Sequence, residues 1–216
     1  MGIKVSMFSG GKDGLRAAQL EYPVDAFLFL IYDFPEPSPH IVNLQATVAS
    51  ASSIGRPIIV KRLTKGNEFK ETVELLKGLG VDTLVAGDVF VEDHLKYMEK
   101  VAEESGCRLR EPLWGKDTLE VLMNDIEEGY RLKVLGARPV NLRESVGKVI
   151  DKGNVDWFLE LAKKDGADPL GENGEYHTIV LESPLHKERV EVIDLGMKDL
   201  SCCRIAFVTS YFKQKV

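Results

Sequence analysis

Cysteine is scarce in this sequence of 216 residues, which contains Cys107, Cys202 and Cys203. The three form no C-x-x-C pair, and the neighbours Cys202 and Cys203 are poorly placed to bridge each other. A framework of disulfide bonds is therefore excluded, and we expect reduced thiols in a cytoplasmic protein.

Long apolar runs and an excess of basic residues are also missing. No apolar run is long enough to cross a bilayer, and the first residues lack the apolar stretch of a cleavable signal peptide, so no membrane partner is expected. The net charge is -6 and the pI is near 5.4, which does not favour nucleic acid as a partner. At 44% hydrophobic residues, the chain can form one large domain or a domain with a smaller companion.

Apolar strands alternate with amphipathic helices through the first 130 or so residues. Strands are predicted over residues 3–8, 26–32, 57–63 and 83–89, and residues 107–114 are predicted to form a short fifth strand and its exit loop. Helices are predicted over 14–22, 41–51 before Gly55, 69–76 before Gly78 or Gly80, 95–102 before Gly106, and after Asp117, which has capping-box spacing to Glu120. This α/β rhythm predicts an open parallel Rossmann-like sheet, whose ligands gather outside the carboxyl ends of the strands.

The pattern changes near residue 136, and we predict two domains, 1–135 and a smaller C-terminal α+β lobe over 136–216. Short helices are predicted over 140–150 and 155–164, an antiparallel pair of strands over 177–183 and 189–195, and a closing strand over 204–212.

The stretch "SGGKDG", residues 9–14, follows the first predicted strand and opens a helix. A helix amino terminus offers unpaired N–H groups and partial positive charge, Gly10 and Gly11 allow positive φ, and Lys12 adds a full charge. Asp13 would repel phosphate unless Mg²⁺ lay between them. A Walker A loop is excluded because Ser6 stands where its first glycine belongs, and Asp13 where it has Ser or Thr.

The stretch "GADPLGENGEYHT", residues 166–178, places Asp168, Glu172, Glu175 and His177 among three glycines. Such loops often carry function. They also occur as solvated connections whose glycines serve turns, and the residues alone leave both interpretations open.

The first stretch resembles the S-G-G-x-D-S turn of the ATP pyrophosphatases (PP-loop superfamily), with Gly14 in place of the usual serine. Together with "GDV" at 87–89, "EPLWGKD" at 111–117 and "GENGEYHT" at 171–178, it resembles the diphthine–ammonia ligase family over nearly the whole chain. The resemblance implies an adenine nucleotide alpha hydrolase-like fold. It also implies an enzyme that uses ATP, Mg²⁺ and ammonium to convert diphthine on elongation factor 2 into diphthamide, through an acyl-adenylate, with release of AMP and pyrophosphate.

Carried over to this sequence, the resemblance makes residues 1–135 the ATP-binding domain and 136–216 the lobe for the acceptor substrate. The end of "AFLFLIYDF", including Tyr32, would meet the adenine through backbone groups. Residues implied in binding ATP are Ser9, Gly10, Gly11, Lys12, Asp13, Gly14, Tyr32, Gly87 and Asp88, with Asp13 and Asp88 towards the metal. Residues implied in binding the acceptor or ammonia are Gly171, Glu172, Asn173, Gly174, Glu175, His177 and Thr178. The catalytic set is Lys12, Asp13, Glu172, Glu175 and His177.

The chemistry suits these residue types. Transfer of AMP to a carboxylate creates a good leaving group, and the step needs positioning and charge neutralisation on the pyrophosphate, which Lys12 can supply. A base such as Glu172, Glu175 or His177 could then accept a proton from the nitrogen nucleophile. No glutaminase portion is evident, so free ammonium is the simpler nitrogen source.

Two other functions stay open. One is an RNA-modifying ATP pyrophosphatase, for which "NLRESVGKVIDK" at 141–152 could form a basic strip. The other is a nucleotide-binding module without catalysis, which the departure at Gly14 permits. Asp88 has an equal alternative role as a capping residue, and a homodimer is left open as a partner.

Overall fold

A computed structural model describes residues 2–33 and 37–213. Its contacts divide the chain into two units, and each unit is made of three separate stretches of the sequence. The first unit holds residues 1–9, 13–37 and 56–115, and the second holds residues 10–12, 38–55 and 116–216. Within the described ranges, no helix is long and apolar enough to cross a membrane.

The first unit is built on a parallel sheet of five strands in the order β3-β2-β1-β4-β5, which confirms the predicted fold class. Its strands are β1 (Ile3–Met7), β2 (Ala26–Ile31), β3 (Ile58–Arg62), β4 (Val81–Val85) and β5 (Arg108–Arg110). Its helices are α1 (Lys12–Leu20), α4 (Glu68–Leu79) and α5 (Glu92–Ser105). The fully buried run of β2 has the continuous apolar sequence expected of a central parallel strand.

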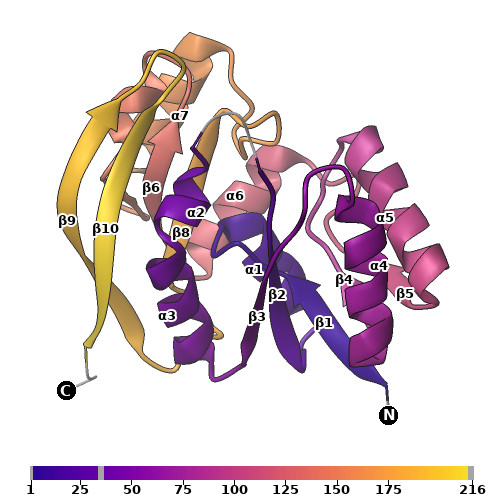
Figure 1. The fold of residues 1–216 in the computed structure, drawn as a ribbon. Helices are drawn as coiled ribbons and strands as arrows, with labels where there is room; N and C mark the ends of the chain where they lie inside the picture. The colour runs from indigo at the N-terminus through magenta and orange to yellow at the C-terminus, as the bar shows by residue number, and fades with distance from the viewer. Residues whose placement is uncertain (1, 34–36, 214–216) are drawn as a thin grey trace. The chain divides into compact units, whose positions relative to one another are not determined.

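Helices α4 and α5 lie side by side on one face of this sheet (Figure 1). Their buried residues Val73, Leu76 and Val101 pack in one core with strand residues such as Leu28 and Leu84. Gly80 ends α4 and Gly106 ends α5, both in the left-handed conformation that favours glycine.

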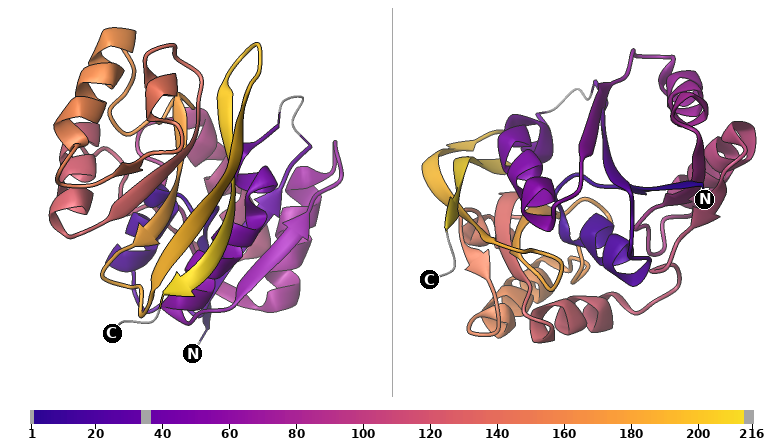
Figure 2. Two further views of the ribbon diagram at one scale, coloured as in Figure 1. Left: turned by 90° about the vertical axis from the view of Figure 1, so that its left-hand side faces the viewer. Right: turned by 90° about the horizontal axis from the view of Figure 1, so that it is seen from below.

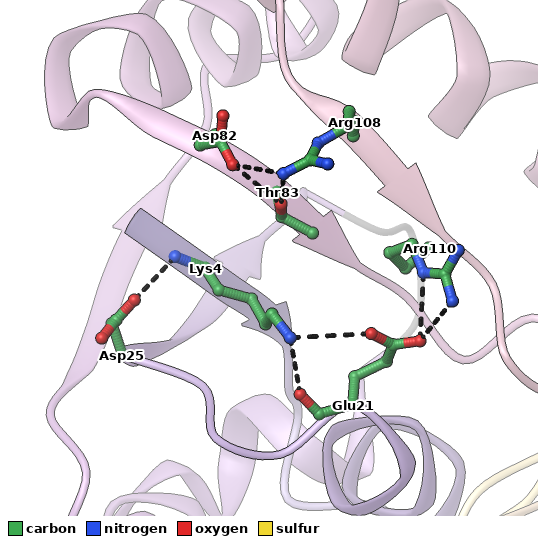
Figure 3. Close-up of polar contacts among 7 residues, drawn as sticks. All are labelled: Lys4, Glu21, Asp25, Asp82, Thr83, Arg108 and Arg110. Atoms are coloured by element: carbon green, nitrogen blue, oxygen red, sulfur yellow. Dashed lines mark hydrogen bonds and ion pairs between the residues drawn. The ribbon is translucent and has the colours of Figure 1, made fainter. Parts of the chain in front are cut away.

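A polar network joins β1, β4 and β5 to the segment after α1 (Figure 3). The Arg110 guanidinium donates to Glu21 Oε1 at 2.9 and 3.0 Å, and Lys4 Nζ donates to the Glu21 carbonyl at 2.8 Å. Arg108 pairs with Asp82 at 2.7 Å. Because most of these groups reach solvent, they fix strand positions more than they add stability.

The second unit is built on an antiparallel sheet, which gives the mixed α+β content predicted for the C-terminal part of the chain. Its strands are β6 (Arg131–Ala137), β7 (Val149–Ile150), β8 (Tyr176–Glu182), β9 (Arg189–Asp199) and β10 (Arg204–Lys213). Its helices are α2 (Pro39–Val42), α3 (Leu44–Ile54), α6 (Thr118–Glu127), the 3-10 helix η1 (Leu142–Ser145) and α7 (Val155–Asp165). Strands β9 and β10 form a long hairpin (Figure 2, left).

The predicted antiparallel pairing of residues 177–183 with 189–195 is wrong. Strand β8 pairs with β6, and β9 pairs with β10. The connection after β8 is bound to α3 instead of folding back as a hairpin: His186 contacts Ser50 at 3.0 Å, and Lys187 N donates to the Ser53 carbonyl at 3.0 Å.

Two predicted helices also need correction. The helix expected over 41–51 is broken at Asn43, whose side-chain amide donates to the carbonyls of Pro39 and Ala206 at 2.8 and 2.9 Å. Its side-chain oxygen also accepts a hydrogen bond from Val208 N at 2.9 Å, so this buried asparagine ties the break between α2 and α3 to β10. The segment 140–150 forms η1 and then the short strand β7, because Gly147 turns the chain with φ +83°.

Other boundaries follow the sequence closely. Asp117 caps α6 and accepts a hydrogen bond from Glu120 N at 2.8 Å, as its spacing predicts. The expected domain boundary between 135 and 136 falls within β6, and it stays a prediction. The part of the expected adenine contact that falls on Phe34 lies outside the described residues.

Candidate functional site

The stretch Ser9–Gly14 follows β1 directly, and α1 begins inside it at Lys12, so the predicted strand–turn–helix context is confirmed. Gly10 has φ +89°, as expected for a turn that needs glycine. Gly10, Gly11 and Lys12 are all buried. The division of the chain passes through this turn, which places Gly10–Lys12 in the second unit and the residues on either side in the first.

Within the second unit, the turn is bound to β8. Val180 N donates to the Gly10 carbonyl at 2.9 Å. A Cβ at Gly10 would lie 2.4 Å from Ile179 Cδ1 and 2.7 Å from Thr47 Oγ1, so no larger residue fits there. The strand that carries the end of "GENGEYHT" therefore contacts the first stretch directly, which connects two segments that the sequence pattern alone could not relate.

Lys12 is 3% exposed, and its Nζ lies 4.8 Å from the centroid of the Tyr176 ring. A cation over an aromatic face is stabilised by the ring quadrupole. The next residue, His177, has its ring 5.2 Å from that of His40 in an edge-on arrangement. Burial, with the charges of Lys12 and Arg138, lowers the pKa of His177 to about 4, so its imidazole is neutral near pH 7.

Within the first unit, two glycines allow close backbone approach at the beginning of α1. A Cβ at Gly14 would lie 2.8 Å from the Met7 carbonyl oxygen. A Cβ at Gly87 would lie 2.7 Å from the Asp13 carbonyl oxygen. The departure from serine at position 14 thus has a packing reason, and the segment after β4 contacts the first turn of α1.

Asp88 follows Gly87 beyond the carboxyl end of β4, as predicted. Its Oδ1 lies 3.2 Å from His94 Nδ1, and its N–H donates to Glu111 Oε2 at 3.2 Å. Gly115 N also donates to the Val89 carbonyl at 2.8 Å. The "GDV" and "EPLWGKD" stretches therefore lie together, while α5 takes Val91 as its N-cap residue.

The loop before β8 is organised by its own carboxylates. Glu175 accepts hydrogen bonds from Asp168 N at 3.1 Å and from Asn173 N at 2.9 Å. Asp168 accepts from Leu170 N at 3.0 Å and from Thr118 Oγ1 at 2.7 Å. Both carboxylates therefore have a structural role in holding the loop, whatever else Glu175 does.

The other predicted residues of this loop divide by exposure. Asn173 is exposed, Glu172 is partly exposed, and Thr178 is buried in the register of β8 with β6. Gly171 and Gly174 have φ +78°, and a Cβ at Gly171 would lie 2.7 Å from the Tyr176 ring. The glycines thus shape the loop, and Glu172 keeps access to solvent.

Sequence reasoning passed over Tyr176, although it stands within a quoted motif, because an aromatic residue beginning a strand usually belongs to the core. It also missed Thr47, His40 and Arg138, for which the sequence offers no local signal. Tyr32 lies after β2 as expected, and burial, with the neighbouring Tyr97, raises the pKa of its hydroxyl.

The turn suits the phosphates of a nucleoside triphosphate. Gly10 has positive φ, and Lys12 adds a buried ammonium within the same turn. Asp13 and Asp88 suit Mg²⁺, which usually takes one or two carboxylates and completes its shell with phosphate and water. Among residues 2–33 and 37–213, no group of three or more His, Cys, Asp or Glu side chains is placed to hold a metal by itself.

Comparison with known proteins agrees with these motifs. Residues 2–109 match the model of the diphthamide synthase N-terminal domain, and residues 117–205 match that of the diphthamide synthase C-terminal domain. A diphthine–ammonia ligase of Bos taurus is 26% identical over 68% of this chain and 56% of its own length. One of Danio rerio is 30% identical over 61% of this chain and 53% of its own length.

The relatives are longer proteins: the diphthine–ammonia ligase of Schizosaccharomyces pombe, 25% identical, is matched over 25% of its length. A solved chain described as a predicted subunit of a tRNA methyltransferase from Methanocaldococcus jannaschii covers 85% of this chain and 98% of its own. Its TM-score of 0.42 and identity of 14% carry no argument about function. The N-terminal domain model includes residues 9–14 and 87–89, the C-terminal domain model includes residues 171–178, and the chain belongs to the diphthamide synthase family.

Proposed function

We propose that this protein is an ATP-dependent ligase that joins ammonium to a carboxyl group, releasing AMP and pyrophosphate. The acceptor is diphthine on elongation factor 2, and the product is diphthamide. The reaction proceeds through an acyl-adenylate, and the protein acts in the cytoplasm. The single observation that carries the proposal is the attachment of Gly10 and Lys12 to the strand that begins at Tyr176.

That attachment supports a ligase because the two halves of the reaction need neighbouring groups. Residues at the amino end of α1 can bind phosphate, and residues at the start of β8 can bind the group that attacks or receives AMP. A nucleotide-binding module without catalysis would need only the first. The relatives named as diphthine–ammonia ligases support the same assignment.

Lys12 and the backbone N–H groups at the beginning of α1 would neutralise the charge that develops on departing pyrophosphate. Removing one donor of this kind commonly costs about 3 kcal/mol of activation free energy. ATP would supply the adenylyl group that joins the acceptor carboxylate as pyrophosphate leaves, and ammonia would then displace AMP from the acyl carbon. Asp13 and Asp88 would hold Mg²⁺ beside the phosphates.

Glu172 is the best candidate base in the loop. Glu175 uses both carboxylate oxygens in bonds to loop amides, and His177 stands under the positive potential of Lys12 and Arg138, which repels ammonium. A partly exposed carboxylate attracts ammonium and can accept its proton. The neutral imidazole of His177 suits a hydrogen bond to the acceptor.

The test is product analysis with purified protein, ATP, Mg²⁺, ammonium and the diphthine-bearing factor. We expect AMP and pyrophosphate in equal amounts, and conversion of the acceptor carboxylate to an amide by mass spectrometry. Without ammonium, labelled pyrophosphate should exchange into ATP only when the acceptor is present, as an acyl-adenylate requires.

Three results would contradict the proposal. Release of ADP and orthophosphate would remove the pyrophosphatase assignment. ATP binding with no turnover under any condition would favour the binding module. AMP release that depends on RNA, with binding that weakens steeply as salt rises, would favour RNA modification.

A further inference from the structure

The contact between Lys12 and Tyr176 has a role that neither the family motifs nor the proposed reaction assigns. A lysine that is 3% exposed must meet a partner that offsets lost hydration, and the Tyr176 ring lies 4.8 Å from its Nζ. The lysine side chain has several rotatable bonds, so a fixed ring face reduces the number of positions open to its charge.

The ring itself is held on several sides. Tyr176 is 3% exposed, and its hydroxyl donates to the Pro169 carbonyl at 2.7 Å. The Phe158 ring meets it edge-on at 5.0 Å, and Gly171 leaves no room for a Cβ, which would lie 2.7 Å from the ring. The ring is therefore a rigid support, more precise than a second flexible side chain would be.

We infer that Tyr176 is a positioning residue: its ring face holds the Lys12 ammonium in the place where it meets the phosphates of ATP. The inference rests on the proposed binding of ATP at residues 9–14. It makes the loop 166–175 part of the nucleotide site, because the loop holds the Tyr176 ring and the ring in turn positions the Lys12 ammonium. Tyr176 acts through Lys12 and does not touch the reacting atoms.

The experiment varies the ring quadrupole while keeping its shape. Tyr176→Phe removes the hydroxyl bond to Pro169 and is the reference. Phenylalanines with one, two and three ring fluorines are then placed at position 176, since each fluorine weakens attraction for a cation above the ring. Affinity is measured by calorimetry with an ATP analogue that has a methylene group between its α and β phosphorus atoms, without acceptor.

We expect affinity to fall with each fluorine, by about tenfold in total, which corresponds to about 1.4 kcal/mol. The trend should vanish in the Lys12→Met background, because no cation then faces the ring. The matched control is the same fluorinated series at Phe69 in the first unit, where Lys100 Nζ lies 5.1 Å from the ring centroid. Fluorination at Phe69 should leave the affinity for the ATP analogue unchanged.

If the affinity for the analogue stays constant or rises as fluorines are added at position 176, the inference is overturned. Binding of the analogue by the wild type would still support the proposed function. Failure of the wild type to bind the analogue would instead overturn the ATP site itself. If fluorinated variants do not fold, the wild type still decides: the Hε protons of Lys12 must show upfield ring-current shifts in its NMR spectrum, and ordinary shifts would end the case.

Discussion

Val180 N donates a 2.9 Å hydrogen bond to the carbonyl oxygen of Gly10, and these two residues lie 170 positions apart in a sequence of 216. The bond fixes the turn after β1 against β8 in the second unit. A change at either partner should therefore be felt at both.

Lys12→Met should abolish AMP release. Loss of one charge-neutralising donor lowers kcat by about 10² to 10³. The measurement is the rate of AMP formation at saturating ATP and acceptor, with circular dichroism to verify folding. Lys65→Met removes an exposed lysine of the first unit and should keep the wild-type rate. A folded Lys12→Met protein with more than about a tenth of wild-type activity would contradict a role at the phosphates.

Glu175→Ala and Glu172→Ala should separate structure from chemistry in one loop. Without Glu175, the amides of Asp168 and Asn173 lose their acceptor, which costs about 0.5–1.5 kcal/mol of unfolding free energy and speeds hydrogen exchange over residues 168–174. Glu172→Ala should reduce amide formation, with a smaller loss of unfolding free energy than Glu175→Ala, because Glu175 accepts two main-chain hydrogen bonds of the loop. Equal loss of stability in the two variants would refute this division.

Gly14→Ser, which restores the residue usual at this turn in the wider superfamily, should destabilise this protein. Its Cβ would meet the Met7 carbonyl at 2.8 Å, so α1 or β1 must shift, at a cost of about 1–3 kcal/mol. Gly78→Ser in α4 is the control, because its Cβ would meet nothing within 4 Å and helix propensity improves. Thermal unfolding should show Tm lowered in the first variant and slightly raised in the second.

The buried His186 should make stability depend on pH. Burial lowers its pKa to about 4 from an ordinary value of 6.5. Between these values the unfolded chain binds a proton that the native protein does not, so the free energy of unfolding falls as pH falls from 6.5 towards 4. The slope from this residue is about 1.4 kcal/mol per pH unit.

His186→Gln keeps polar groups near Ser50 and Ser183. It should lower the slope of unfolding free energy against pH by the contribution of about one bound proton. Urea unfolding from pH 4.5 to 7.5 measures it. The same variant should have the wild-type slope above pH 7, where both states hold the imidazole neutral. An unchanged slope between pH 4.5 and 6 would show that His186 titrates normally in the native protein.

The parallel sheet could be predicted because its information is local. The strands are short apolar runs, helices α4 and α5 end at Gly80 and Gly106, and the crossover connections between parallel strands have one preferred handedness. The turn at residues 9–14 carries its own chemistry within six residues. None of these features depends on a distant partner.

The antiparallel sheet depends on distant partners, and there prediction failed. Adjacent strands suggested a hairpin, but Ser50 and Ser53 bind residues 186–188 and remove β8 from β9. Likewise, the role of Tyr176 follows from Lys12, which no spacing within the motif could reveal. A contact between side chains that are far apart in the sequence leaves little trace in the hydrophobic periodicity from which helices and strands are predicted.

Helix α3 draws its core partners from strands made much later in synthesis. Ala46 and Ala49 pack with Leu135, then Ile179 and finally Val208. A nascent chain that has emerged only as far as residue 109 would present this helix to chaperones with its apolar side uncovered. Assembly of the second unit must therefore await emergence of the chain from the ribosome as far as Val208.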